Sequence, residues 1–192
     1  MFFLAQYFQT VHGEGPLGAG LRLMPWTATL VCAPIAGRLA DKVGERTFVG
    51  GGLLLQTLAM GWIAVVADTD TGYLEILPAL VIGSAGLTMA MPAAQKAVVG
   101  AVRPQEIGQA SGAFMMLQIF GGVFGVAVTV AVFASVGGYT SAEEFSEGFA
   151  AAMGAVTAFA LIGTLVALGM PRRTAPPKVT DAVPQHENAP LA

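Results

Sequence analysis

Residues 107–136 read IGQASGAFMMLQIFGGVFGVAVTVAVFASV, a stretch without a single charged side chain. A helix needs roughly 20 predominantly apolar residues to cross the hydrocarbon core of a bilayer, and this stretch exceeds that length. In lipid, the backbone polar groups must be hydrogen-bonded within the segment, which favours a helix over an isolated strand. The stretch therefore predicts a transmembrane helix and makes lipid the main solvent of this protein.

Four other apolar blocks of similar length extend this interpretation to most of the chain. Hydrophobic residues make up 55% of the 192 residues and charged residues only 11%, whereas soluble domains have about 25% charged residues. We predict an all-α transmembrane helix bundle over residues 1–170, with about five complete spans plus the end of a sixth. The N-terminal stretch is too short to span and is expected to be a helix end whose beginning is missing. The expected ranges are about 1–12 (partial), 17–39, 47–67, 74–99, 107–136 and 149–170.

Basic residues alternate from one connection to the next. Lys and Arg surround the first and third connections and follow the last span, whereas the second (DTDTGY) and the fourth (GGYTSAEEFSEG) have acids only. The positive-inside rule assigns the basic connections to the cytoplasm. We therefore expect a multi-pass protein of the cell membrane with a cytoplasmic C-terminus. Residues 171–192, rich in Pro and poor in large apolar residues, are expected to form a disordered cytoplasmic tail.

Arg22 is the exception to this alternation, because it lies about one turn into the span expected at 17–39, near its outer face. We expect its long side chain to extend to the lipid headgroups, with a polar contact inside the bundle as the alternative.

The chain has no residue pattern typical of an enzyme or a metal site. It contains no H-E-x-x-H motif and no Gly-rich phosphate loop after a strand. His12 and His186 lie outside the complete spans, and neither has a companion ligand nearby in the sequence. We predict no enzymatic activity, no metal and no cofactor. The scattered basic residues also argue against a nucleic-acid partner, which leaves the lipid bilayer as the expected partner.

The connection after the span at 17–39 has the most specific pattern in the chain, GRLADKVGER at residues 37–46. Its glycines permit a tight turn and a close approach of helices. Asp41 precedes the next helix, where a negative charge is favoured. The basic residues can pair with acids of neighbouring helices, so the turn could lock or release one packing arrangement; an ordinary basic loop is the alternative. The residues of this candidate latch are Gly37, Arg38, Asp41, Lys42, Gly44 and Arg46.

The same ten residues resemble a known family. GRLADKVGER matches, position by position, the G-x-L-A-D-R/K-x-G-x-R/K signature found between the second and third helices of each half of a major facilitator superfamily transporter. Residues 15–26 (GPLGAGLRLMPW) and 108–128 (GQASGAFMMLQIFGGVFGVAV) resemble its fourteen-span drug:proton antiporter subfamily. The resemblance covers roughly residues 3–172 and implies the C-terminal half of such a transporter.

The resemblance implies secondary active transport, with proton-coupled efflux of drugs or other hydrophobic or cationic small molecules. Alternating access would arise from rocking against a missing N-terminal half. Such families carry their proton-coupling carboxylate and their antiporter G-P motif in that N-terminal half, and neither has a counterpart in this sequence. We therefore expect that this chain alone does not perform coupled transport.

A few polar residues lie within the expected spans, where they must face protein or water rather than lipid. Hydrogen bonds between helices are their first interpretation. As the alternative, they could line a cavity together with polarizable side chains suited to varied apolar cations. The candidate cavity residues are Trp26, Gln56, Met60, Thr88, Gln95 and Gln118.

Small residues indicate where helices could pack closely. Gly121 and Gly125 form a G-x-x-x-G face, and glycines at 50–52 crowd the start of another span. Such surfaces let backbones approach in lipid, where no hydrophobic effect drives helices together. We expect close packing at both places.

A function of a different class competes with transport. The short first helix also fits a non-transporting membrane module, such as a truncated gene product or a regulatory subunit. The coding DNA upstream of Met1 discriminates between the two. An in-frame extension with further spans supports the transporter, and a stop codon supports the truncated product.

Overall fold

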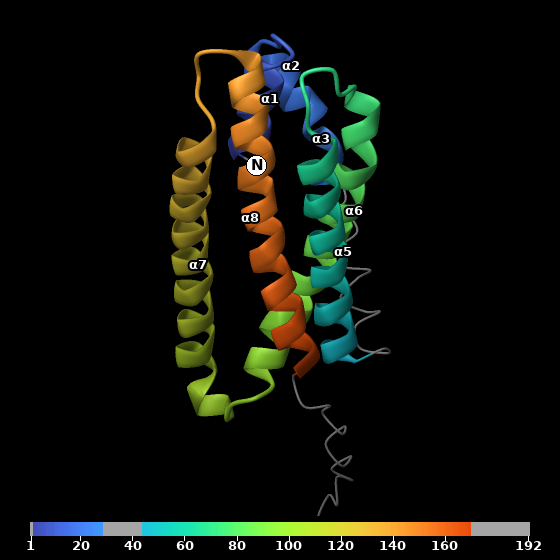
Figure 1. Cartoon of the computed structure of the whole chain (residues 1–192). Coiled ribbons are helices and arrows are strands. Elements are labelled where there is room, and N and C mark those ends of the chain that lie inside the picture. The colour runs from blue at the N-terminus through green and yellow to red at the C-terminus, as the bar shows by residue number, and fades with distance from the viewer. Residues whose placement is uncertain (1, 29–43, 170–192) are drawn as a thin grey trace, which may run out of the picture.

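The computed structural model describes residues 2–28 and 44–169, and helices are the only regular elements in these two ranges (Figure 1). This confirms the predicted all-α fold class. The four long helices are α5 (Glu45–Val66), α6 (Tyr73–Val99), α7 (Ile107–Val136) and α8 (Ala142–Gly169). The shorter elements are α1 (Phe2–Thr10), α2 (Pro16–Arg22), α3 (Met24–Ala28) and the 3-10 turn η2 (Pro104–Glu106).

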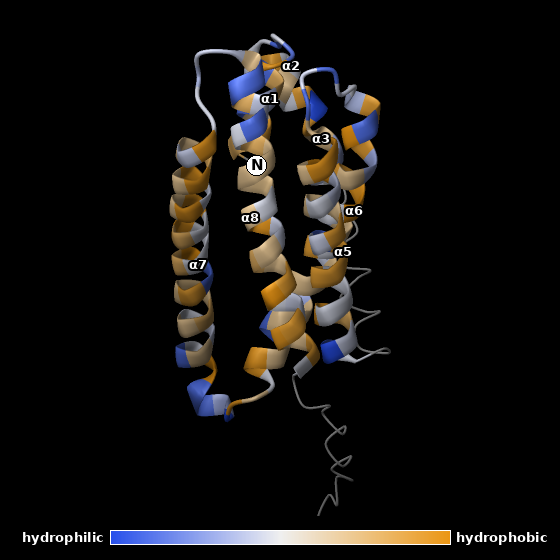
Figure 2. Ribbon diagram, in the orientation of Figure 1, coloured by the Kyte–Doolittle hydropathy of each residue, from blue (hydrophilic) through white to orange (hydrophobic). Residues whose placement is uncertain are grey.

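All four long helices are long and apolar enough to cross a membrane. Figure 2 shows hydrophobic residues along most of their length and hydrophilic residues towards their ends. The described ranges thus contain four of the five complete spans expected from the sequence. The fifth, expected at 17–39, lies outside the described residues beyond position 28, as does the tail expected at 171–192.

The described part of the span expected at 17–39 is not one continuous helix. The N–H of Leu23 is shared between the carbonyl groups of Ala19 and Gly20, at 3.2 Å each, and α2 ends there. Pro25 has no N–H to continue the hydrogen-bond ladder, and its ring clashes with the carbonyl group four residues earlier. A proline in the first turn of a new helix is tolerated, so α3 begins at Met24 as a separate element.

The helix α8 begins at Ala142, before the apolar span that was expected from residue 149. Its first turn contains Glu143 and Glu144, and acids are favoured at the positive N-terminal end of a helix. The hydroxyl of Ser141 also accepts a hydrogen bond from the N–H of Glu144 at 3.1 Å. The helix therefore extends beyond the apolar stretch by which the span was recognised.

The helix α5 makes the two most extensive contacts in the bundle, with α6 and with α8. At the crossing with α6, Gly52 and Gly86 let the two backbones touch. A Cβ placed on Gly52 would lie 2.5 Å from the carbonyl oxygen of Gly86, closer than real Cβ contacts. The glycine run at 50–52 thus serves the close packing expected from the sequence, through Gly52.

The largest buried side chains gather at the end of the bundle where α1 lies. Tyr7 of α1 is fully buried and stacks on Phe149 of α8, with ring centroids 4.6 Å apart. Other members of this cluster come from α1, α5, α6 and α8, namely Leu4, Phe8, Ile63, Ile76, Leu80 and Phe145. Ala19 of α2 and Phe133 of α7 also belong to it. The core therefore holds α1 against α5, α6 and α8 at one end of the molecule.

The two ends of the bundle differ in charge. We call the end with the α5–α6 and α7–α8 connections, uppermost in Figure 1, the acidic end. Its exposed acids are Asp68, Asp70, Glu75, Glu143, Glu144 and Glu147. The opposite end, which we call the basic end, has Arg46, Lys96 and Arg103 beside Glu45 and Glu106.

Candidate functional site

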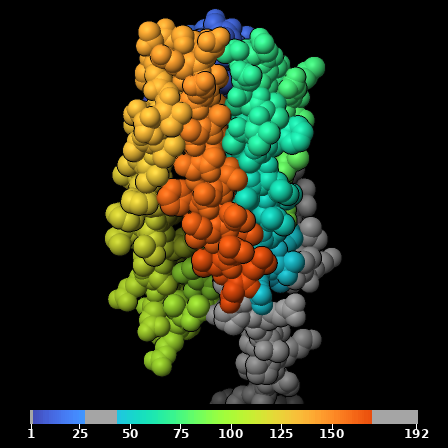
Figure 3. Space-filling view, viewed as in Figure 1, coloured from blue at the N-terminus to red at the C-terminus, as the bar shows by residue number. Residues whose placement is uncertain are grey.

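The helix α7 stands at one edge of the bundle (Figures 1 and 3). It is the least buried of the four long helices. Only 11% of the most apolar stretch of this span is buried inside the structure, against 44% for α6. Its exposed side chains are large and apolar, among them Met115, Met116, Phe120 and Phe124. This helix therefore presents a long surface that the described residues leave uncovered.

Gln118 lies near the middle of α7 and is exposed. Its Nε2 donates to the Sδ atom of Met91 on α6 at 3.4 Å. A thioether is a weak acceptor, so this contact uses little of the hydrogen-bonding capacity of the amide. Because an amide at membrane depth must face protein or water, the surface shared by Gln118 and Met91 is unsuited to lipid. We call these two residues the α6–α7 wall.

Trp26 is half-buried where α3 meets α6. A Cβ placed on Gly83 of α6 would lie 2.9 Å from the Trp26 ring and 3.1 Å from Cβ of Ala59 on α5. The indole therefore fits into a notch that only a glycine leaves open.

Gln56 and Thr88 each keep a buried side-chain oxygen, Oε1 and Oγ1, that has no hydrogen-bond partner within the described part of the chain. Such groups are rare in folded proteins and are often explained by water or by function.

The remaining cavity candidates lie elsewhere. Met60 is buried in the cluster at the acidic end. Gln95 is exposed near the basic end, in an open depression that also includes Glu45, Pro92 and Lys96. The structure therefore does not gather the six candidates into one pocket within the described residues, and only Gln118 belongs to the α6–α7 wall.

The candidate latch is described only in part, because Gly37, Arg38, Asp41 and Lys42 lie outside the described residues. Gly44 caps the start of α5 with φ +95°, a left-handed conformation that favours glycine. The guanidinium of Arg46 donates to the carbonyl oxygen of Leu168 in the last turn of α8. A cation is favoured at a helix C-terminus, so Arg46 ties the start of α5 to the end of α8.

The G-x-x-x-G face of α7 differs from its expectation. A Cβ placed on Gly121 or Gly125 would meet nothing within 4 Å, so these glycines make no close helix contact with the described residues. They line an apolar groove of about 430 Å³ together with aromatic rings of α1, α7 and α8, among them Phe2, Phe3, Phe124 and Phe159.

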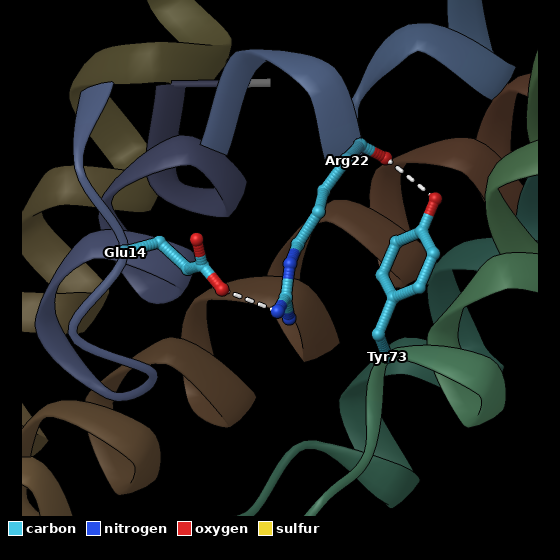
Figure 4. A network of polar contacts seen from close by, with 3 residues as sticks. All are labelled: Glu14, Arg22 and Tyr73. Carbon is cyan, nitrogen blue, oxygen red and sulfur yellow. Dashed lines mark hydrogen bonds and ion pairs between the residues drawn. The ribbon is translucent and has the colours of Figure 1, made fainter. Parts of the chain in front are cut away.

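A network at the acidic end was not foreseen from the sequence (Figure 4). The guanidinium of Arg22 forms an ion pair with Glu14. Its central carbon lies 5.7 Å from the ring centroid of Phe8 and 5.3 Å from that of Tyr73. The hydroxyl of Tyr73 donates to the carbonyl oxygen of Arg22 at 3.0 Å. The alternative expected for Arg22, a polar contact within the bundle, is therefore present.

His12 lies beside this network, in the connection between α1 and α2. Its ring centroid is 5.3 Å from that of Tyr7 and 5.7 Å from that of Phe8, and its Nε2 is buried without a partner in the described ranges. Burial, and then the positive charge of Arg22, lower the pKa of His12, while the Glu14 carboxylate opposes this.

Comparison with known proteins identifies relatives over much of the chain. The family described as the Major Facilitator Superfamily matches residues 1–192. The Dehydrocurvularin exporter of Alternaria cinerariae is 28% identical over 137 residues, which is 70% of this chain and 23% of the relative. MFS transporter L2 of a Phoma species is 30% identical over 135 residues, 69% of this chain and 22% of the relative.

A bacterial relative has a similar level of identity. The Multidrug resistance protein B homolog of Mycobacterium tuberculosis is 29% identical over 127 residues, 65% of this chain and 24% of the relative. The chain thus spans about a quarter of the length of the curated relatives it matches.

Proposed function

This chain belongs to the Major Facilitator Superfamily, and from that premise we propose that it is part of a secondary active transporter that exports hydrophobic or cationic small molecules in exchange for protons. The relatives support export, since their names include an exporter and a multidrug resistance protein. The resemblance of residues 15–26 and 108–128 to the fourteen-span drug:proton antiporters supports the proton coupling and the subfamily.

The observation that carries this proposal is the α6–α7 wall. Gln118 is a solitary exposed amide among exposed apolar side chains near the middle of a span, which is a costly arrangement against lipid. A water-filled or substrate-filled cavity removes that cost. The amide then offers a hydrogen bond, and Met91 and Met115 offer adaptable, polarizable surface for varied apolar molecules.

A second set of helices would close this cavity. The relatives are about four times as long as the matched region, so a transporter of their length has enough residues for a second half. Rocking of two halves around a site at the membrane midplane is the usual mechanism of secondary transporters. The uncovered face of α7 fits such a partner, because it is the least buried surface of the bundle.

We place the acidic end outside the cell and the basic end, with the C-terminus, in the cytoplasm of a multi-pass plasma-membrane protein. Residues 37–46 would then form a cytoplasmic latch. The tie from Arg46 to Leu168 supports this role, since it couples the end of the turn to α8. In that latch Asp41 is the residue whose charge we expect to matter most.

The proposal is tested on the whole transporter that contains this chain, in inside-out membrane vesicles from cells that express it. A pH gradient should drive uptake of ethidium, a lipophilic cation, and a protonophore should abolish that uptake. Gln118→Ala should reduce uptake, whereas Gln105→Ala, an exposed glutamine in η2 outside the apolar stretch, should leave it unchanged.

Each part of the proposal has its own refutation. Ethidium uptake no greater than in vesicles without the protein contradicts export of lipophilic cations. Uptake that survives the protonophore contradicts proton coupling. Equal uptake by Gln118→Ala and Gln105→Ala removes the α6–α7 wall from the substrate path.

A further inference from the structure

Arg22 connects four parts of the chain at the acidic end (Figure 4). Its guanidinium bonds to Glu14 in the α1–α2 connection and lies against Phe8 of α1 and Tyr73 of α6. Through its backbone, the C-terminus of α2 also accepts the hydrogen bond from Tyr73. We call Phe8, Glu14, Arg22 and Tyr73 the acidic-end clasp, because these contacts hold α2 against both α1 and α6.

His12 shares an aromatic ring with this clasp. Its imidazole centroid and the Arg22 guanidinium carbon both lie 5.7 Å from the ring centroid of Phe8. Protonation would therefore place two cations on one ring. It would also place a proton on a ring whose Nε2 is buried and has no acceptor among the described residues.

The groups around His12 offer little to neutralise a second positive charge. Glu14 is the nearby carboxylate, and it is already paired with Arg22. From α1, Tyr7 contributes a hydroxyl that donates to the carbonyl oxygen of Asp68, and α6 contributes the phenol of Tyr73.

The other described elements packed here contribute acids and an aromatic ring but no basic group. The α5–α6 connection and the start of α6 contribute the exposed acids Asp68 and Glu75, and α8 packs through Phe149 on Tyr7. With neutral His12 the Glu14–Arg22 pair is balanced, whereas charged His12 adds a second cation that competes with Arg22 for the Glu14 carboxylate.

We propose that the acidic-end clasp is a proton-operated switch, closed while His12 is neutral and released when His12 is protonated. Repulsion from the imidazolium displaces Arg22 from Phe8 and Tyr73. The C-terminus of α2 then loosens from α1 and α6. The lowered pKa of His12, due to burial and to Arg22, agrees with a closed clasp that disfavours the charged form. The switch goes beyond the proposed transport, because it needs only the residues of this bundle and can be measured without any transport activity.

The first test measures the coupling between the two cations. The sequence has two histidines, His12 and His186, so NMR of the imidazole Cε1–H groups of the chain in lipid nanodiscs follows both, and His12→Asn assigns them. We expect the pH at the titration midpoint of His12 to rise in Arg22→Gln, which removes the positive charge of Arg22. It should stay low in Arg22→Lys, which keeps the charge.

The second test measures opening of the clasp. Ala19 of α2 is 1% exposed and Leu21 is 56% exposed. In a Cys32→Ser background, the labelling rate of Ala19→Cys by a water-soluble maleimide is divided by that of Leu21→Cys, which cancels the intrinsic pH dependence of the thiol. This ratio should rise on acidification, by about tenfold for each unit by which the closed clasp lowers the His12 pKa. His12→Asn should abolish the rise.

Two results would overturn the proposal. One is a His12 midpoint that is the same in the wild type and in Arg22→Gln, because the two cations would then not be coupled. The other is a labelling ratio that does not change with pH, or that still changes in His12→Asn. If Ala19→Cys does not fold, the NMR comparison decides alone, because it needs no change in the core.

Discussion

Replacement of Gly52 by alanine should push α5 away from α6 and lower the stability of the bundle. The new Cβ would lie 2.5 Å from the carbonyl oxygen of Gly86 and 2.9 Å from the backbone nitrogen of Ala90. Both neighbours are backbone atoms of a helix, so neither can move aside by a change of rotamer. Relief requires a shift of one whole helix.

The size of that shift follows from the distances. Ordinary contacts begin at about 3.4 Å, so the oxygen and the Cβ must separate by 3.4 minus 2.5, or about 0.9 Å. A gap of 0.5–1 Å forfeits about a quarter to a half of the dispersion energy of each contact. Since α5 and α6 share the most extensive contact in the bundle, we expect a loss of about 1–3 kcal/mol, the usual range for overpacking.

Gly51 supplies the matched control. It lies in the same turn of α5, and a Cβ placed on it would meet nothing within 4 Å. Both substitutions change helix propensity equally, by up to about 1 kcal/mol. The difference between Gly52→Ala and Gly51→Ala therefore isolates the packing term.

The assay is reversible unfolding of the purified chain in mixed micelles by titration with sodium dodecyl sulfate, followed by circular dichroism. If the two variants unfold within about 0.5 kcal/mol of each other, the close approach does not limit stability. Gly86→Ala gives a second check, because its Cβ would meet the carbonyl oxygen of Gly52. The double variant should lose less than the sum of the single losses, since the first Cβ has already parted the helices.

Three further predictions concern single contacts. Thr57→Val should lower the free energy of unfolding by about 0.6 kcal/mol, because it removes the buried 3.2 Å hydrogen bond between the hydroxyls of Thr57 and Thr164. The double variant with Thr164→Val should lose less stability than the two single variants together. Arg46→Gln should free the carbonyl group of Leu168 and speed hydrogen exchange in the last turn of α8 roughly two- to fivefold. Because the pKa of His12 is lowered from 6.5, the folded state binds fewer protons than the unfolded state below that pH. The contribution of neutral His12 to stability is therefore present above pH 6.5 and lost as the pH falls. His12→Asn should weaken the dependence of the free energy of unfolding on pH.

Each of these predictions has a control in the same chain. Within the described residues, the hydroxyl of Thr157 bonds only to the carbonyl oxygen of Met153 in its own helix, so Thr157→Val should lower stability less than Thr57→Val. Arg103 is exposed, and Arg103→Gln should leave exchange in α8 unchanged. Equal effects in either pair would contradict the assigned contact. For His12, stability that rises on acidification would reverse the sign derived above.

The membrane character and the course of the long helices could be predicted from the sequence. Uncharged runs such as 107–136 are local features, and the cost of unsatisfied backbone groups in lipid turns them into helices without reference to any neighbour. The ends of helices were harder to predict. The start of α8 depends on a side chain, Ser141, and on two acids that hydropathy counts against a span.

The candidate site could be predicted only in part. Gln118 was identified because a polar residue inside a span must face protein or water. Met60 was named as a polarizable side chain in another span, and it is buried in the core at the acidic end. The difference depends on which face of α5 meets α8, and periodicity within a uniformly apolar helix does not record this.

The glycines and Arg22 show which properties follow from the sequence alone and which depend on the tertiary structure. The sequence by itself determined that lipid surrounds this chain, that its backbone is helical and that small residues allow close approach, because each of these follows from neighbouring residues. Only the tertiary structure decided that Gly52 makes such an approach while Gly121 and Gly125 line an open groove. It also decided that Arg22 lies between Phe8 and Tyr73. Those contacts join residues far apart in the chain, and they exist only once helices have chosen their partners.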